Sequence, residues 1–142
     1  MWDRCAEMNE KFSCREIARG VVEGEALVSE DQILFYHADP ATGIVTEHGH
    51  CLEGVSVRDK ILVFPGGKGS SVVQQDGLYH LDCHKNMPSA LIVQYPDPVL
   101  VAGAIIMELP MVDRVDPAFY ELVKDGDMVL VNADEGYVEI QD

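Results

Sequence analysis

Basic residues are scarce in this sequence. Lys and Arg together number 10, against 25 Asp and Glu, so the formal net charge of the 142 residues is −15. A surface of this sign repels nucleic-acid phosphates and acidic lipid headgroups, which excludes general nucleic-acid binding and attachment to acidic membranes. Long apolar runs are missing as well, because residues 99–107 form the longest one and roughly 20 residues are needed to span a bilayer. We therefore expect no nucleic-acid partner and no membrane partner.

Cysteine is sparse and scattered. The chain contains no Cys-x-x-Cys pair, and a disulfide-stabilised secreted domain has a denser framework than this one. The first ten residues mix acidic and basic side chains and contain no apolar stretch typical of a secretory signal. The sequence thus predicts a cytoplasmic location, with reduced thiols at Cys5, Cys14, Cys51 and Cys83.

Apolar residues, in contrast, are plentiful. They make up 47% of the chain, which is sufficient for the core of one domain of this length. Because residues 1–11 are mostly polar, we expect an N-terminal tail there and a single domain over residues 12–142.

Short β-branched and apolar segments, separated by glycine and proline, indicate a domain rich in strands. We expect strands at residues 17–22, 25–28, 44–46, 60–64, 90–93, 128–132 and 137–140, the first two being two short strands or one bulged strand. We expect three helices. The first has Ser70 or Ser71 as its N-cap, the second begins at the N-cap Asp97 and is stopped by Pro110, and the third covers residues 117–123. This content predicts an α+β fold or a layered β/β/α domain.

A glycine-rich segment, PGGKGSS at residues 65–71, joins a predicted buried strand to a predicted helix. Glycines let the backbone approach a ligand closely, and the N–H groups at a helix start favour an anion. Lys68 adds a positive charge, and the two serine hydroxyls offer a proton acceptor or an anion clamp. A Walker A loop is excluded because glycine follows the lysine. These residues fit an anion site and a plain connection with a serine cap equally well.

A second candidate site is the segment that contains His48, His50 and Glu53. Residues i and i+2 of a strand share a face, so the two histidines can chelate one metal ion. With the glutamate they loosely resemble the His-x-His…Glu signature of cupins, which gives one alternative hypothesis, a free-standing cupin-like metal-binding protein. His80 and His84 are spaced by one helical turn, without the glutamate of a zincin motif. Solvated histidines are the other interpretation of both pairs.

Four short stretches follow one another in a characteristic order. They are the Asp39-Pro40…Thr42-Gly43 turn, Gly49-His50…Leu52-Glu53-Gly54, the Gly67-Lys68-Gly69-Ser70 loop, and Gly103-Ala104-Ile105 before Pro110. In this order, and over about residues 12–132, the chain resembles the swivelling small-subunit domain of the aconitase X family. That family includes the archaeal phosphomevalonate dehydratase and bacterial cis-3-hydroxy-L-proline dehydratases.

The resemblance implies a swivelling β/β/α domain that is the small subunit of a hydro-lyase and is active only with its large subunit. The large subunit is expected to hold an iron or iron–sulfur centre, and this chain is expected to bind no metal of its own. The substrate is a small hydroxy carboxylic acid of the phosphomevalonate or cis-3-hydroxyproline class.

The resemblance also assigns roles to residues of this chain. A serine of the glycine-rich loop serves as the base in the wider aconitase superfamily, and by position this role falls on Ser70. The expected substrate-binding residues are Gly67, Lys68, Gly69, Ser71, Asp39 and His50. An iron ion can act as a Lewis acid on the leaving hydroxyl while a base removes the proton next to the carboxylate.

Two stretches differ from the archaeal pattern of the family, namely FYHADP at residues 35–40 and VVQQDG at residues 72–77. If both lie where the substrate approaches, they favour a hydroxy acid other than phosphomevalonate. A dry apolar patch for the large subunit is expected near the loops at residues 37–43 and 66–71. A further hypothesis is a non-catalytic module that binds a small anion on the glycine-rich loop.

Overall fold

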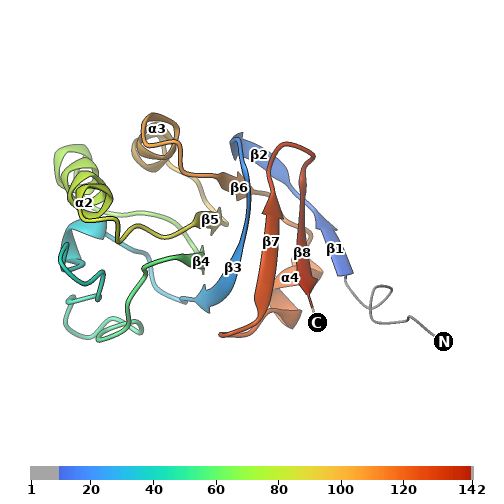
Figure 1. Cartoon of the computed structure of the whole chain (residues 1–142), viewed down its shortest axis with the longest axis horizontal. Coiled ribbons are helices and arrows are strands. Elements are labelled where there is room, and N and C mark those ends of the chain that lie inside the picture. The colour runs from blue at the N-terminus through green and yellow to red at the C-terminus, as the bar shows by residue number, and fades with distance from the viewer. Residues whose placement is uncertain (1–9, 142) are drawn as a thin grey trace.

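The structure, a computed structural model, describes residues 10–141 (Figure 1). In that part of the chain the strands are β1 (Glu10–Ser13), β2 (Arg15–Ala18), β3 (Val21–Val28), β4 (Lys60–Phe64), β5 (Ala90–Val93), β6 (Met111–Asp113), β7 (Met128–Asn132) and β8 (Tyr137–Gln141). The helices are the 3₁₀-helix η1 (Phe35–His37) and the α-helices α2 (Ser71–Cys83), α3 (Pro98–Ile106) and α4 (Pro117–Leu122).

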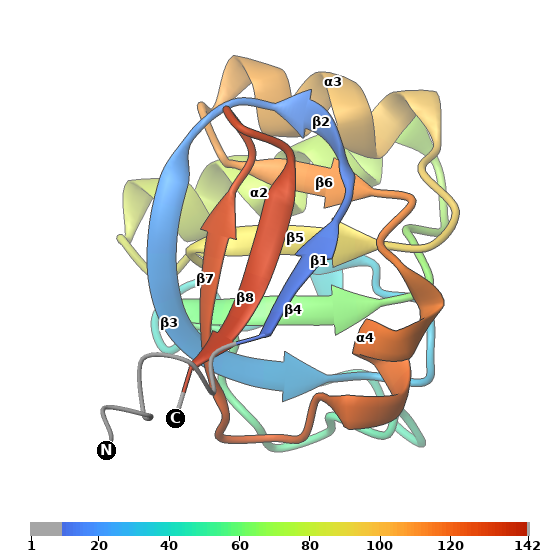
Figure 2. The ribbon, with the colours of Figure 1, turned by 90° about the vertical axis from the view of Figure 1, so that its right-hand side faces the viewer.

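The strands form one mixed sheet with the order β1-β8-β7-β3-β4-β5-β6-β2. The long strand β3 connects its two halves, because residues 21–25 pair with β7 antiparallel and residues 25–28 pair with β4 parallel. Figure 2 shows the consequence: β3 bends, and strands β7, β8 and β1 cross in front of β4 and β5. The two end strands of the sheet, β1 and β2, follow each other in the chain with only Cys14 between them.

Three layers result, with β1, β7 and β8 on one side, the parallel strands β4, β5 and β6 in the middle, and helices α2 and α3 on the other side (Figure 1). The middle strands are buried on both faces, which explains their unbroken apolar sequences KILVF and ALIV. In β4, Leu62 and Phe64 belong to the core under the helices, whereas Ile61 and Val63 belong to the core between the two β layers. The predicted α+β fold with a β/β/α arrangement is confirmed.

Both long helices begin at the caps that the sequence predicts. Ser70 is the N-cap of α2, and its hydroxyl oxygen accepts a hydrogen bond from the N–H of Val73. Asp97 is the N-cap of α3, and Pro98 occupies the first turn. Both helices follow a parallel strand, so their N-termini lie at the end of the sheet where β4 and β5 finish.

Several strand boundaries differ from the predictions. Residues 17–22 are interrupted at Arg19 and Gly20, whereas β3 runs through Gly24, whose missing side chain lets the strand pass the carbonyl oxygen of Asp59. Residues 44–46 make only isolated bridges, because they belong to a loop that folds back on itself. Glu10 and Lys11, predicted in a tail, pair with β8 and bring Phe12 into the core. The rest of the predicted tail, residues 1–9, lies outside the described residues.

Within residues 10–141, none of the helices has both the length and the apolar character that a bilayer crossing requires.

Candidate functional site at the carboxyl ends of the parallel strands

The glycine-rich loop lies where three parallel strands end. The connection after β3 runs beside the connection after β4, since the N–H of Ile33 donates to the carbonyl oxygen of Gly66 at 3.0 Å. The side-chain amide of Gln32 also donates to the carbonyl oxygen of Gly67, at 3.3 Å. The carboxyl ends of parallel strands are the usual place for ligands in open α/β sheets. The predicted loop therefore has the position of a ligand site.

Two glycines of the loop are required by their surroundings. A Cβ atom on Gly67 would lie 2.7 Å from Nε2 of Gln74 and 3.0 Å from Oδ2 of Asp97. Gly69 has a φ of +88°, which glycine adopts readily, and a Cβ there would lie 3.0 Å from the side chain of Leu34. The loop thus keeps its path only with glycine at both positions.

Ser70 and Ser71 lie at the start of α2, and both are exposed to solvent. Oγ of Ser70 is 3.4 Å from the N–H of Val73, which donates to it. The hydroxyl therefore lies at the positive end of a helix of 13 residues, where a negative charge is stabilised. A serine in this position is available for acid–base chemistry as well as for capping.

Lys68 forms an ion pair with Glu47. Its ammonium lies 2.6 Å from Oε2 of Glu47, and both side chains are about two-thirds or more buried, with 35% and 24% of their surface exposed. Glu47 comes from the loop that returns toward the site, 21 residues earlier in the chain. No local sequence signal marks it, because the contact depends on how the two loops fold together.

Asp31 adds a second carboxylate to this edge. The backbone N–H of Cys51 donates to Oδ2 of Asp31 at 2.9 Å, and this hydrogen bond is the main cause that lowers the pKa of Asp31 below its ordinary value. The thiol of Cys51 and the nearby His50 and Lys68 lower the pKa further. Asp31 is thus ionised at neutral pH and contributes to the balance of charge around Lys68.

The buried residue Gln74 connects α2 to the segment that follows β3. It is 1% exposed, its Oε1 accepts from the N–H of Phe35 at 2.7 Å, and its Nε2 donates to the carbonyl oxygen of Ile33 at 3.1 Å. These bonds hold the segment after β3 against the first turns of α2. Gln74 lies four and seven residues before the buried Leu78 and Leu81, and this helical spacing is the signal that could have indicated its burial.

His50, predicted to bind substrate, has a structural position instead. It is 6% exposed, its Nδ1 accepts from the N–H of Leu52 at 2.9 Å, and its Nε2 therefore donates to the carbonyl oxygen of Gln32 at 2.9 Å. Both ring nitrogens are occupied, so that His50 can position Gln32 but offers no atom to a ligand. The structure therefore supports a positioning role for His50, and its contact with the substrate stays a prediction.

The positions of His48 and His50 also argue against the cupin-like hypothesis. The side chain of His48 is 99% exposed and lies 3.3 Å from Oε2 of Glu53, away from the buried ring of His50. Within residues 10–141, the side chains that come close enough to share a metal ion are Asp31, His50 and Cys51, of which the histidine is already fully hydrogen-bonded. His80 pairs with Asp76 on the exposed face of α2, which is the solvated interpretation.

Asp39 lies far from the serines. Its carboxylate accepts from the N–H of Ala41 at 2.9 Å within its own turn, and the adjacent Pro40 accepts from the side chain of Asn86. Asn86 follows the C-terminus of α2, whose 13 residues span about 19 Å from Ser70. The substrate-binding role of Asp39 stays a prediction. The loops at residues 37–43 and 66–71 lie toward opposite ends of α2, because residues 35–40 run along that helix.

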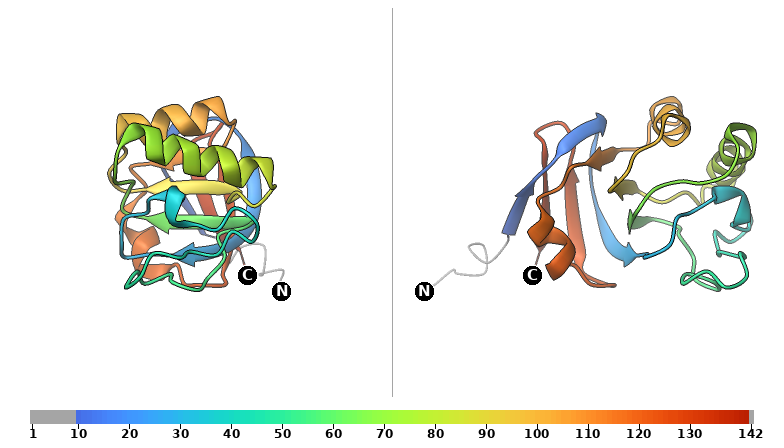
Figure 3. Two further views of the ribbon diagram at one scale, coloured as in Figure 1. Left: turned by 90° about the vertical axis from the view of Figure 1, so that its left-hand side faces the viewer. Right: turned by 180° about the vertical axis from the view of Figure 1, so that it is seen from behind.

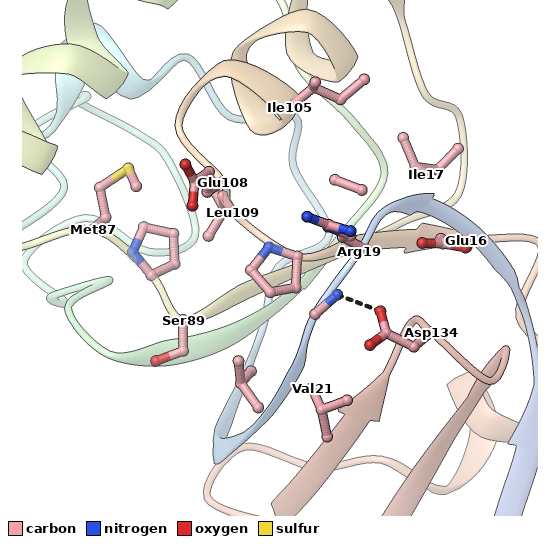
Figure 4. Close-up of a pocket in the computed structure, with 15 residues that line it drawn as sticks. Glu16, Ile17, Arg19, Val21, Met87, Ser89, Ile105, Glu108, Leu109 and Asp134 are labelled. Atoms are coloured by element: carbon pink, nitrogen blue, oxygen red, sulfur yellow. Dashed lines mark hydrogen bonds between the residues drawn. The ribbon is translucent and has the colours of Figure 1, made fainter.

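A hollow of about 1010 Å³ opens at the end of the sheet opposite to the glycine-rich loop (Figure 4). Ser89 and Pro110, which precede β5 and β6, line it together with Ile17, Val21 and Leu109. Because this hollow adjoins the amino ends of the parallel strands, it does not belong to the glycine-rich loop.

Comparisons with known proteins agree with this geometry. Residues 11–140 match the family described as the aconitase X swivel domain. The chain is 48% identical over 131 residues to the phosphomevalonate dehydratase small subunit of Methanosarcina mazei, covering 92% of this chain and 90% of that protein. It is 48% identical over 134 residues to the protein of the same name from Archaeoglobus fulgidus, covering 92% of this chain and 98% of that protein. The crystal structure of Thermococcus kodakaraensis aconitase X superimposes with a TM-score of 0.85 at 42% identity, covering 94% of this chain and 99% of that chain.

Proposed function

Because this chain belongs to the aconitase X swivel-domain family, we propose that it is the small subunit of a hydro-lyase that removes water from phosphomevalonate together with a large subunit. The observation that carries the proposal is the exposed Ser70 on the glycine-rich loop, at the N-terminus of α2, in a chain that aligns with phosphomevalonate dehydratase small subunits over nearly its full length. The cupin-like and anion-module hypotheses receive no comparable support.

Phosphomevalonate is the favoured substrate for two reasons. Relatives with 48% identity carry that name. The two stretches that had favoured another hydroxy acid have packing roles, because residues 35–40 run along α2 and Gly77 of α2 lets the backbone of Tyr36 approach closely. Differences at these positions therefore reflect how η1 packs on α2 rather than the shape of a substrate site.

Ser70 is proposed as the base. Elimination of water requires that the proton next to the carboxylate moves to Oγ of a deprotonated Ser70, while hydroxide leaves the neighbouring carbon and a carbon–carbon double bond forms. The N–H of Val73 and the N-terminus of α2 stabilise the negative charge on Oγ before the proton arrives. Ser71, one residue further, lies beside the reacting group and contributes a hydroxyl that can position the substrate.

The substrate anion is proposed to bind at Lys68 and at the backbone of Gly67 and Gly69. Close approach is possible because the loop has no side chains at these two glycines. Lys68 supplies the positive charge, and a substrate anion must exchange with Glu47 to reach it. Binding therefore costs the Lys68–Glu47 contact and gains a contact with the substrate.

The iron centre that the family implies is assigned to the large subunit. The cysteines in the described part of the chain are Cys14, Cys51 and Cys83, and they form no cluster with one another. The possible metal ligands close to Cys51 are Asp31 and His50. Partial burial raises the pKa of Cys14 to about 11. These residues do not fit an iron–sulfur cluster.

Reconstitution with the cognate large subunit tests the proposal. We expect loss of phosphomevalonate only when both subunits are present, measured by mass spectrometry of the dehydrated product, with each subunit alone as control. Elimination from cis-3-hydroxy-L-proline instead would contradict the substrate, and activity of the large subunit alone would contradict the need for this chain. Stoichiometric metal on the isolated chain that disappears in a His48→Ala, His50→Ala double variant would favour the cupin-like alternative.

A further inference from the structure

Helix α3 is apolar on every side, although one side faces outward. Its sequence PVLVAGAII contains neither a charged nor a polar side chain. Leu100 and Ala104 are buried against the sheet, whereas Ile105 and Ile106 are 55% and 71% exposed. A helix with apolar residues all round is normally covered on all sides. The outward face of α3 therefore lacks its partner in the isolated chain.

The adjacent helix extends this apolar surface toward the glycine-rich loop. Val72 and Tyr79 of α2 are 76% and 56% exposed. A shallow groove of about 460 Å³ is lined by these two residues together with Ser71, Gln75, Asp76 and Met107, which lies just past α3. Figure 3, left, shows α2 and α3 side by side across the outer face of the molecule. We call the surface formed by Val72, Tyr79, Ile105, Ile106 and Met107 the α2–α3 face.

We propose that the α2–α3 face is the docking surface for the large subunit, an inference that rests on the proposed function. Ser71 lines the groove and follows Ser70 directly, so a protein that lies on this face also reaches the loop. On the proposed function, residues 10–141 supply a base and an anion site, and their cysteines lie apart from one another, so the iron centre must come from a protein that lies next to Ser70. A single partner on the α2–α3 face satisfies both requirements.

The charge distribution favours a different chain over a second copy of this one. The molecule carries a net charge of −15, so two identical copies repel each other. Ile105 also lines the large hollow at the end of α3, whose other lining residues include the acidic Glu16, Glu108 and Asp134 and the basic Arg19 (Figure 4). A partner with an apolar patch bordered by basic side chains complements this surface, and the hollow can receive one of its side chains.

The test replaces Ile106 with glutamate in the full-length chain. Ile106 is exposed, so Ile106→Glu leaves the fold intact, which thermal unfolding checks. The matched control is Leu122→Glu on α4, where leucine is 45% exposed on the other side of the molecule. Calorimetric titration with the cognate large subunit measures the affinity of each variant.

We expect Ile106→Glu to weaken pairing at least tenfold, because a carboxylate is then buried against the partner, and Leu122→Glu to pair like the wild type. At saturating large subunit the kcat of the Ile106→Glu enzyme should equal that of the wild type. If the wild type pairs and Ile106→Glu pairs equally well, the docking surface is wrong while the proposed function stands. If the wild type does not pair with the large subunit at all, both the docking surface and the proposed function are wrong. Self-association of the isolated wild type that Ile106→Glu abolishes would assign the face to a second copy.

Discussion

The ammonium of Lys68 lies 2.6 Å from Oε2 of Glu47, which comes from a separate loop. The cation that the sequence marks for an anionic substrate therefore already has a carboxylate partner. On the proposed function, a substrate anion competes with this carboxylate for Lys68, and the strength of the ion pair limits how tightly the loop binds the substrate. We therefore propose that Glu47 is a determinant of substrate affinity.

Replacing Glu47 with glutamine should lower KM. The substitution keeps the shape of the side chain and removes the charge that competes for Lys68. Partly exposed ion pairs contribute about 0–1 kcal/mol, so we expect KM to fall by up to about fivefold with kcat unchanged. Lys68→Ala should raise KM instead, because it removes the positive charge that attracts the substrate anion. The control is Glu25→Gln, which removes an ion pair of equal length, 2.6 Å to Lys60, at the other end of β4. A KM that rises in Glu47→Gln would mean that Glu47 orients Lys68 rather than competing for it.

His50→Ala should destabilise the fold. The change leaves the N–H of the buried Leu52 and the carbonyl oxygen of the more exposed Gln32 without their partner. We expect the free energy of unfolding, measured in urea, to fall by about 2–3 kcal/mol. His48→Ala, two residues away and fully exposed, should change it by less than about 0.5 kcal/mol. Equal effects of the two substitutions would contradict the structural role of His50.

Gly77→Ala should destabilise α2 even though alanine is the better helix former. A Cβ at this position would lie 2.2 Å from the backbone nitrogen of Tyr36, so η1 would have to move away from the helix. At Gly103 of α3 a Cβ would lie 2.8 Å from Cδ1 of Leu78, a side-chain atom that can shift. We expect Gly77→Ala to lower the melting temperature clearly more than Gly103→Ala does. The reverse order in differential scanning calorimetry would contradict the close packing of η1 on α2.

Much of the fold is predictable because its signals are local. The apolar sequences of β4 and β5 indicate strands buried on both faces, and Ser70, Asp97 and Pro98 indicate helix starts. The boundaries at β1 and β2 are not predictable in this way. These strands have four residues each and are defined by pairing with β8 and β6, more than 90 residues further along the chain.

The candidate site likewise combines features with a local sequence signal and features that depend on contacts between segments. The strand–glycine–serine–helix pattern is local, and it correctly locates the loop around Ser70 at the end of β4. Glu47 and Asp31 act through contacts between segments, for which a single sequence gives no sign, whereas the helical spacing of Gln74 from Leu78 and Leu81 indicates its burial but not its partners. His50 and Asp39 show what a motif leaves open: each is a polar residue in a matching motif, and the structure uses its polar atoms for hydrogen bonds within the chain, those of His50 with Gln32 and Leu52 and that of Asp39 with Ala41.

The most direct measurement is the kcat of a reconstituted enzyme that carries Ser70→Ala, with Ser71→Ala as the neighbouring control. Loss of the cap lowers stability by about 0.5–2 kcal/mol, which leaves the fold and the pairing with the large subunit intact. Loss of the base should lower kcat by about 10²–10⁴, and Ser71→Ala should lower it less. A Ser70→Ala enzyme with near-normal kcat would show that Ser70 only caps α2 and that the base lies at Ser71 or on the large subunit.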